Sequence, residues 1–340
     1  MPLRHPVTIS RRTLLGTLTA ATAGLALTAV LMPPTVVLAQ AASEAEKPAG
    51  AAPGGAAAPV KVVASFSILG DLVKQVGGPL VAVDLLVGPN ADMHAFQPSP
   101  ADSKKLAGAK LVVINGLGLE GWVERMTKAS GYTGPVVVAA KGLKPIAKPK
   151  EKGHDHDHGH GHDHGKDDPH AWQSVGNVKL YVANIRDGLA AVDPANKATY
   201  AANADAYLKQ LDALDRDIKA AFEGVPKDRR QVITAHQAFR YYGAAYGIEF
   251  RGAKGVTEES EPSAREIADL IKLIKKEKVR ALFVENTSNR RLLDRIAQET
   301  DAKVGGTLFS DALSDATGPA PTYIDMMRAN TKALADALKG

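Results

Sequence analysis

The chain has 340 residues, of which 45% are hydrophobic and 23% charged, a composition typical of a globular protein and not of a disordered or fibrous one. The formal net charge of +5 falls to +2 without residues 1–41, because this segment holds three of the 42 basic residues and none of the 37 acidic ones. So small an excess gives no basis for nucleic-acid binding, and no nucleic-acid partner is expected.

The N-terminal segment has the features of an export signal. Arg11 and Arg12 precede a mostly apolar run, which ends at a proline pair and is followed by small residues near Ala39 and Ala41. We expect residues 1–41 to be removed on maturation, with a membrane anchor as the alternative. The arginine pair resembles a twin-arginine signal, and a general secretory signal is the other possible route.

Cysteine is absent from the sequence. An exported chain without cysteine has no disulfides, no thiolate for a metal and no lipid-modified cysteine, so it must be stabilised by burial alone. We therefore expect a soluble periplasmic protein that is not a lipoprotein.

The predicted fold begins after a flexible leader of alanine, proline and glycine at residues 42–59. The N-terminal lobe is assigned to residues 60–173. Within it, short β-branched runs alternate with helical patterns, which indicates a parallel sheet flanked by helices. The expected strands are 60–66, 81–87, 110–116 and 135–140, and the expected helices between them are 68–78 and 100–108.

Residues 174–223 are predicted to form a helical connector. Apolar side chains recur at steps of three and four from 198 to 222, which predicts one long rigid helix. Alternation resumes in the C-terminal lobe, residues 224–340, with strands at 230–235, 279–286 and 302–309 and helices at 238–247, 263–277 and 288–300. The predicted fold class is therefore α/β, with two lobes, each a mostly parallel sheet flanked by helices, joined by one long rigid helix.

Seven of the ten histidines lie within residues 154–170. This segment has no apolar residue from His154 to Asp168, so it cannot fold alone, but its alternating imidazoles can bind divalent metal weakly. We expect an auxiliary metal loop within 153–166, and the alternative is a solvated loop without a role. Its histidines are His154, His156, His158, His160, His162 and His164.

Three histidines outside the alternating run 154–164 are better placed for a selective site. His94 follows the expected strand 81–87, His236 ends the expected strand 230–235, and His170 lies where a helix begins. In an open parallel sheet, ligands collect beyond the carboxyl ends of the strands. Any one of these histidines alone is more often a loop or capping residue, but their joint placement favours a metal site.

Three imidazoles leave one position of a tetrahedron for a carboxylate. Asp311 ranks first because it follows the last predicted strand at its carboxyl end. Asp92, Glu285 and Asp315 are competitors, and a helix cap or a surface charge is the alternative reading of each acid.

The motifs MHAFQPSP, DPHAW, TAHQAFRYYGAAYG, EPSAREI and LFSDALS resemble, in order and spacing, those of the metal-binding substrate-binding proteins of ABC importers, the ZnuA/TroA-like family for zinc and manganese. The resemblance covers Val60 to Lys339. It implies the ligands His94, His170, His236 and Asp311, and two lobes linked by a long helix.

The same resemblance implies that Zn²⁺ is captured as the transported ligand and delivered to a membrane permease. Manganese members tend to have a carboxylate where His236 stands, so a third imidazole favours zinc, with Mn²⁺ as the alternative. Some zinc members have a glutamate beside the first histidine, whereas Met93 stands here. We also expect a monomer, with a periplasmic zinc chaperone as a further candidate partner.

Two other functions are compatible with three histidines: a periplasmic zinc buffer or chaperone, and a zinc hydrolase. Hydrolysis needs an open coordination position and a general base beside the bound water. Four protein ligands leave no room for a substrate, so we expect no enzyme.

The export signal can be tested directly. We expect mass spectrometry of the exported protein to find a new N-terminus near Ala39 to Ala41, and an intact N-terminus would contradict the prediction. Replacing both Arg11 and Arg12 by lysine should block export if the route is twin-arginine, whereas unchanged export would favour the general secretory route.

The auxiliary role of the histidine-rich segment can be tested by deleting residues 153–165. The deletion should remove weak extra metal equivalents and leave one tight site, because His170 lies beyond it. Zinc titration against a competing chelator measures both classes of site, and loss of all tight binding would make this segment the main site.

Overall fold

The structure is a computed structural model that describes residues 58–148, 166–234, 236–252, 264–277, 279, 281–287, 291–300 and 302–339. The expected signal and all but the last two residues of the expected leader lie outside this set. Among the helices in these ranges, none combines the length and apolar character that a membrane span needs.

The N-terminal lobe contains a four-stranded sheet in the order β2-β1-β3-β4, in which every pair of neighbours is parallel. Its strands are β1 (Val60–Phe66), β2 (Val81–Val87), β3 (Leu111–Ile114) and β4 (Val136–Val138). Its helices are α1 (Ser67–Gly77), α2 (Pro100–Ala107) and α3 (Val123–Ser130). Ser99 and Asp102 form a reciprocal capping box at the start of α2, where Pro100 occupies the first helical position.

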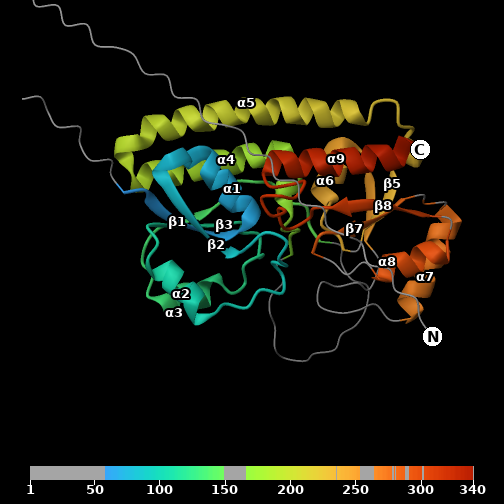
Figure 1. Cartoon of the computed structure of the whole chain (residues 1–340), viewed down its shortest axis with the longest axis horizontal. Coiled ribbons are helices and arrows are strands. Elements are labelled where there is room, and N and C mark those ends of the chain that lie inside the picture. Colours follow the sequence, from blue (N-terminus) through green and yellow to red (C-terminus); the bar gives the residue numbers. More distant parts are fainter. Residues whose placement is uncertain are drawn as a thin grey trace, which may run out of the picture. The chain divides into compact units, whose positions relative to one another are not determined.

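The C-terminal lobe repeats this arrangement in the order β6-β5-β7-β8, again with parallel neighbours. Its strands are β5 (Gln231–Thr234), β6 (Glu249–Gly252), β7 (Ala281–Glu285) and β8 (Lys303–Leu308). Helices α6 (Arg240–Tyr246), α7 (Ala264–Glu277) and α8 (Arg291–Gln298) belong to the same lobe. Two parallel sheets flanked by helices confirm the predicted fold class (Figure 1).

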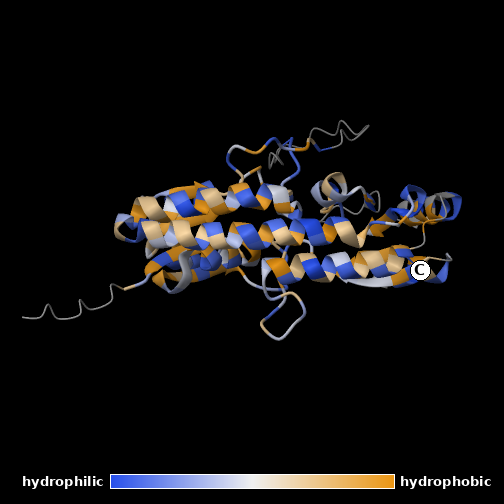
Figure 2. Ribbon diagram, turned by 90° about the horizontal axis from the view of Figure 1, so that it is seen from above, coloured by the Kyte–Doolittle hydropathy of each residue, from blue (hydrophilic) through white to orange (hydrophobic). Residues whose placement is uncertain are grey.

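Three helices are longer: α4 (Val175–Val192) packs on the N-terminal lobe, α5 (Lys197–Ala221) runs from one lobe to the other, and α9 (Tyr323–Lys339) packs against β8 of the C-terminal lobe (Figure 1). Helix α5 contacts α1 and α4 on one side of the molecule and α9 on the other, as Figure 1 shows. The apolar residues that predicted α5 are all buried: Tyr200, Ala204, Tyr207, Leu211, Leu214 and Ile218. Figure 2 shows hydrophilic and hydrophobic residues mixed along these helices, as expected for amphipathic helices.

Helix α4 packs against β3 and β4 of the N-terminal sheet. Gly188 allows this close approach, because a Cβ atom there would lie 2.2 Å from Cγ2 of Val137. Helices α3, α4 and α9 and strand β6 had no individual counterpart among the predicted elements, although α4 lies within the predicted helical connector. Among the strands that the structure describes, β6, with sequence EFRG, pairs with β5 alone, and it has no hydrophobic run to mark it.

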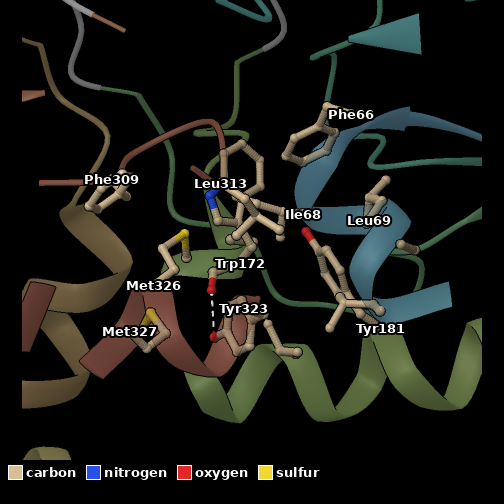
Figure 3. Close-up of a cluster of buried hydrophobic side chains, with 14 of the residues drawn as sticks. Phe66, Ile68, Leu69, Trp172, Tyr181, Phe309, Leu313, Tyr323, Met326 and Met327 are labelled. Atoms are coloured by element: carbon tan, nitrogen blue, oxygen red, sulfur yellow. Dashed lines mark hydrogen bonds between the residues drawn. The ribbon is translucent and has the colours of Figure 1, made fainter. Parts of the chain in front are cut away.

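One hydrophobic core runs through both lobes. Figure 3 shows where they meet: Trp172 and Tyr181 lie among side chains from α1 and α9, and the hydroxyl of Tyr323 donates a hydrogen bond of 2.9 Å to the carbonyl of Trp172. A second, smaller core lies on the other face of the C-terminal sheet and includes Ile233 and Leu282.

The segment after β8 is hydrogen-bonded to the N-terminal lobe by its own backbone. The amide of Leu313 donates to Oγ of Ser67 (3.0 Å), and its carbonyl accepts from the amide of Asn90 (2.9 Å). The amide of Tyr323 donates to Oδ2 of Asp71 (2.8 Å). These three bonds fix the segment between Leu313 and Tyr323 against helix α1 and the loop after β2.

We predict that Ser67→Ala destabilises the protein. The substitution would leave the buried amide of Leu313 without its acceptor, at a cost of about 1–3 kcal/mol in the free energy of unfolding. Urea denaturation measures this change. Ser103→Ala, on the partly exposed face of α2, is the matched control, and equal effects of the two variants would contradict the prediction.

Candidate metal site

Four loops from different parts of the chain bring three imidazoles and one carboxylate together. His94 lies in the loop after β2, and His170 immediately precedes the short 3₁₀ helix η2 (Ala171–Gln173). His236 follows β5, and Asp311 follows β8. Each of these four residues offers one nitrogen or oxygen atom, and the four atoms all lie within 4.8 Å of one another.

The distances within this group are short. Nε2 of His94 lies 3.3 Å from Nε2 of His170. Asp311 presents both carboxylate oxygens to the rings: Oδ2 lies 3.1 Å from Nε2 of His236 and 3.7 Å from Nε2 of His94, and Oδ1 lies 3.5 Å from Nε2 of His170. All three Nε2 atoms therefore face the same carboxylate.

The parallel topology explains why these side chains meet. In each sheet the chain passes from the first strand (β1 or β5) to a neighbour on one side and then to a neighbour on the other side, so the strand order reverses there. Loops beyond the carboxyl ends of strands at such a reversal point converge on a crevice. His236 follows β5 and Glu285 ends β7, its neighbour across the reversal point in the C-terminal sheet.

His170 is held from behind by Asp168. Oδ1 of Asp168 accepts a hydrogen bond from the His170 amide (3.0 Å) and lies 2.8 Å from Nδ1 of the same residue. The side chains of both residues are almost fully buried. Asn115 extends this support, because its amide nitrogen donates to the carbonyl of Pro169 (2.9 Å).

His236 has a comparable partner that comes from a distant part of the chain. Oε1 of Glu285 accepts a hydrogen bond from the His236 amide (2.9 Å), and Oε2 lies 2.5 Å from Nδ1 of the ring. Glu285 is 1% exposed, and its carboxylate lies on the Nδ1 side of the ring, away from Asp311.

His94 is positioned by its own loop. Oδ1 of Asp92 accepts a hydrogen bond from the His94 amide (2.8 Å), which closes a tight turn before the imidazole. With 13% of its side chain exposed, His94 is the most accessible of the three histidines.

The backbone beside Asp311 is held by the turn that carries His170. Nε1 of Trp172 and Nε2 of Gln173 both donate to the carbonyl of Ser310, at 2.8 and 2.7 Å. On the other side, Asn330 of α9 accepts from the amide of Phe309 (2.8 Å). Asp311 is 1% exposed, so its direction is set by contacts from both lobes.

The electrostatics of the group follow from its burial. Burial lowers the pKa of His236, but Glu285 and Asp311 outweigh this effect and raise it well above its ordinary value. Burial raises the pKa of Asp311, but the charges of the three imidazoles outweigh it and hold the pKa below its usual range. A divalent cation would take over the role of this positive charge beside Asp311.

Of the four acids considered from the sequence, only Asp311 faces all three imidazoles. Asp92 caps the backbone before His94, Glu285 contacts the far side of His236, and Asp315 accepts hydrogen bonds from Thr317 in an exposed turn. Asp168 was not among the sequence candidates, although its spacing to His170 equals that of Asp92 to His94.

The six histidines expected to form the auxiliary loop, 154 to 164, lie outside the described residues. On either side of them, Ala147 pairs with Asp167 in an antiparallel bridge. The hydroxyl of Tyr241 on α6 accepts from the amide of Ile146 (3.0 Å) and donates to the carbonyl of Asp168 (2.9 Å).

A groove of about 830 Å³ opens elsewhere on the C-terminal lobe, between β8, α9 and the turn at residues 314–319. It reaches Glu285 but none of the four residues that face one another. Its lining mixes apolar and charged side chains, among them Phe309 and Lys332, and offers no comparable set of metal ligands.

The sequence profile of the family described as the periplasmic component A of zinc-uptake complexes, ZnuA, matches residues 62–337. The chain belongs to this family. These are the periplasmic, metal-binding, substrate-binding proteins of ABC transporters, so the resemblance predicted from the sequence motifs is confirmed.

Relatives within this family are named for different metals. The chain is 31% identical over 283 residues to the iron-binding protein YfeA of Yersinia pestis, covering 83% of this chain and 88% of the relative. It is 32% identical over 279 residues to the manganese-binding lipoprotein MntA of Halalkalibacterium halodurans, covering 82% and 88%.

Solved structures show the same fold. The periplasmic zinc-binding protein TroA of Treponema pallidum superposes with a TM-score of 0.73 at 28% identity, covering 82% of this chain and 99% of that one. A manganese-bound periplasmic metal-binding protein from Candidatus Liberibacter asiaticus gives 0.71 at 29% identity with the same coverage. Membership of the ZnuA family thus shows that the chain binds a metal. Because its relatives are named for different metals, the identity of the metal must be inferred from this chain's own ligands.

Proposed function

We propose that this protein captures Zn²⁺ between its two lobes with high affinity and delivers it to the membrane permease of an ABC importer. The ligands are His94, His170, His236 and Asp311. The observation that carries the proposal is the convergence of three buried or half-buried Nε2 atoms on one buried carboxylate.

The spacing of these atoms supports a tetrahedral ion. Zinc bonds of about 2.0–2.1 Å place neighbouring tetrahedral ligands about 3.3 Å apart. The four separations described above lie near this value, from 3.1 Å for His236 and Asp311 to 3.7 Å for His94 and Asp311, and all four ligand atoms lie within 4.8 Å of one another. Little rearrangement is then needed when the ion arrives.

The chemistry of the ligand set supports zinc over manganese. Imidazole suits zinc, whereas manganese is better suited by carboxylate, carbonyl and water oxygens. Here three ligands are imidazoles and one is a carboxylate. A manganese- or iron-binding protein is the second candidate, because relatives named for these metals share the fold and most of the chain.

Binding without catalysis is the function we infer for the site. Four protein ligands around one ion leave no position for a substrate or an activated water, which a zinc hydrolase requires. A buffer or chaperone without a transporter is compatible with the same four ligands, but family membership favours delivery to a permease.

The histidine-rich segment is proposed to supply metal to this site. It is bounded by the Ala147–Asp167 bridge, which lies three residues from His170. Tyr241 holds both sides of this bridge to helix α6. Metal collected on the imidazoles of the segment would therefore be brought close to one of the four ligands.

We propose that the mature protein is a soluble, periplasmic monomer, and that a zinc chaperone is a further partner. Some relatives are named as lipoproteins, MntA and FimA of Streptococcus parasanguinis among them. This chain contains no cysteine, which supports an unlipidated protein released by cleavage of its export signal.

Removing an imidazole should abolish tight binding. A site of this kind is expected to bind zinc with a dissociation constant near about 1 nM, or roughly −12 kcal/mol. His236→Ala should raise that constant by orders of magnitude, while Asp311→Ala should raise it less, because water can take the carboxylate position. Titration with zinc against a competing chelator measures both, and Asp315→Ala, in the exposed turn, is the control.

The cobalt form reports the coordination number. We expect an intense visible spectrum typical of four ligands. A weak octahedral spectrum together with tighter manganese than zinc binding would overturn the zinc assignment. Ester or peptide turnover that is lost in His236→Ala would favour the hydrolase instead.

A further inference from the structure

We infer that Asp311 forms a preassembled set of three ligands with His94 and His170, and that His236 is the ligand that completes the site. The inference rests on the proposed function, because it concerns the order in which the proposed ligands meet the ion. Asp311 follows β8, so by its position in the chain it belongs to the C-terminal lobe. Among the described residues, however, most hydrogen bonds of the backbone at 310–313 are made with the N-terminal lobe.

The turn that carries His170 holds the residue before Asp311. The carbonyl of Ser310 accepts hydrogen bonds from Nε1 of Trp172 (2.8 Å) and Nε2 of Gln173 (2.7 Å). Gln173 is fully buried and lies three residues after His170, so these bonds join the two ligands over a short path. Oδ1 of Asp311 lies 3.5 Å from Nε2 of His170, close enough for both atoms to bind one ion.

The loop that carries His94 holds the residues after Asp311. The carbonyl of Leu313 accepts from the amide of Asn90 (2.9 Å), which lies four residues before His94. Asn90 has a left-handed backbone, with a φ of 54°, which asparagine adopts more readily than most residues. The amide of Leu313 donates to Oγ of Ser67 at the start of α1 (3.0 Å). The loop of Asp311 is thus bonded to the segments that carry both other members of the set.

The C-terminal lobe holds the same loop less directly. Asn330 of α9 bonds the amide and the carbonyl of Phe309, each at 2.8 Å, but Phe309 lies two residues before the ligand. Within residues 310–313, the described part of that lobe gives the backbone one hydrogen bond, from Nδ2 of Asn286 to the carbonyl of Ala312 (3.2 Å). We therefore expect the ligand in this loop to move with the N-terminal lobe.

The backbone of His236 is held by its own lobe. Its amide donates to Oε1 of Glu285 on β7 (2.9 Å), and its carbonyl accepts from Oγ1 of Thr234 at the end of β5 (2.7 Å). Its Nε2 atom lies 3.1 Å from Oδ2 of Asp311. A displacement of the ends of β5 and β7 relative to the N-terminal lobe therefore withdraws this imidazole and leaves the other three ligands together. Tyr241 bonds the following helix, α6, to the N-terminal lobe, so we expect this displacement to be small.

The rates of zinc binding test the order of the ligands. Stopped-flow mixing of the mature protein with zinc and a competing fluorescent chelator measures association and dissociation separately. His236→Ala should leave the association rate constant unchanged and raise the dissociation rate constant by the full factor by which affinity falls, because the ion is captured before His236 closes on it. His94→Ala, His170→Ala and Asp311→Ala should each lower the association rate constant, since each removes a member of the capturing set.

Gln173→Met tests the link between His170 and Asp311. The substitution nearly keeps the size of the side chain and removes the donor to Ser310. We expect it to weaken zinc binding about tenfold, the lower end of the effect typical of residues that support metal ligands. In an Asp311→Ala background the same substitution should have no further effect, because Gln173 acts through Asp311. Gln210→Met, on the exposed face of α5, is the matched control.

Asn330→Leu removes the corresponding bonds from the C-terminal lobe, those to Phe309. We expect a smaller loss of zinc affinity than in Gln173→Met, although both hydrogen bonds of the Asn330 side chain to Phe309 are lost. Thermal unfolding of each metal-free variant separates a change in the site from a loss of folding.

Slower association in His236→Ala, or wild-type association in the variants of the other three ligands, would overturn the inference. So would a larger loss of affinity in Asn330→Leu than in Gln173→Met, or an undiminished effect of Gln173→Met in Asp311→Ala. The comparison of rates does not require Gln173→Met to fold. If the wild type does not bind zinc, the proposed choice of metal is wrong, and the same comparisons made with Mn²⁺ still decide the order of the ligands.

Discussion

The geometry of the site depends on the apolar contact between the two lobes. Trp172 is fully buried there, and its indole N–H bonds to the backbone of Ser310, next to Asp311. The carbonyl of Trp172 accepts a hydrogen bond from the hydroxyl of Tyr323 on α9. Because one buried side chain links the turn of His170 to the loop of Asp311, the hydrophobic burial that stabilises the fold also sets the distance between ligands from different lobes.

Charge is balanced within this apolar setting by pairing. Asp168, Glu285 and Asp311 are all nearly inaccessible to solvent, and each contacts at least one imidazole. Burying an isolated carboxylate would be costly, so each acid is stable only because it is hydrogen-bonded or paired. The acids thus divide between two roles: Asp311 faces the centre of the site, and the other two hold rings from behind.

Much of the fold could be predicted from periodicity. The spacing of apolar residues predicts the strands with β-branched runs and the long helix α5. Parallel topology then places His94, His236 and Asp311 beyond strand ends. Strand β6 could not be found this way, because an edge strand of four mostly polar residues depends on its neighbour β5 for its conformation.

The supporting acids show a similar limit at the level of single residues. Asp168 stands two residues before His170, and Asp92 two before His94, so a repeated Asp-X-His spacing was available as a local signal. Glu285 is 49 positions from His236, and only the pairing of β5 with β7 brings them together. From the sequence alone, Glu285 was therefore only one of several possible metal ligands.

The placement of the aromatic side chains gives the protein an optical property. It has two tryptophans, and both stand beside loops that carry imidazoles: the ring centroid of Trp172 lies 5.3 Å from that of His170, and Trp122 packs at 5.0 Å against Phe96, two residues after His94. Emission excited at wavelengths that the eight tyrosines do not absorb therefore originates at two indoles beside loops that carry proposed ligands, so the unlabelled protein carries its own fluorescent reporter of this region.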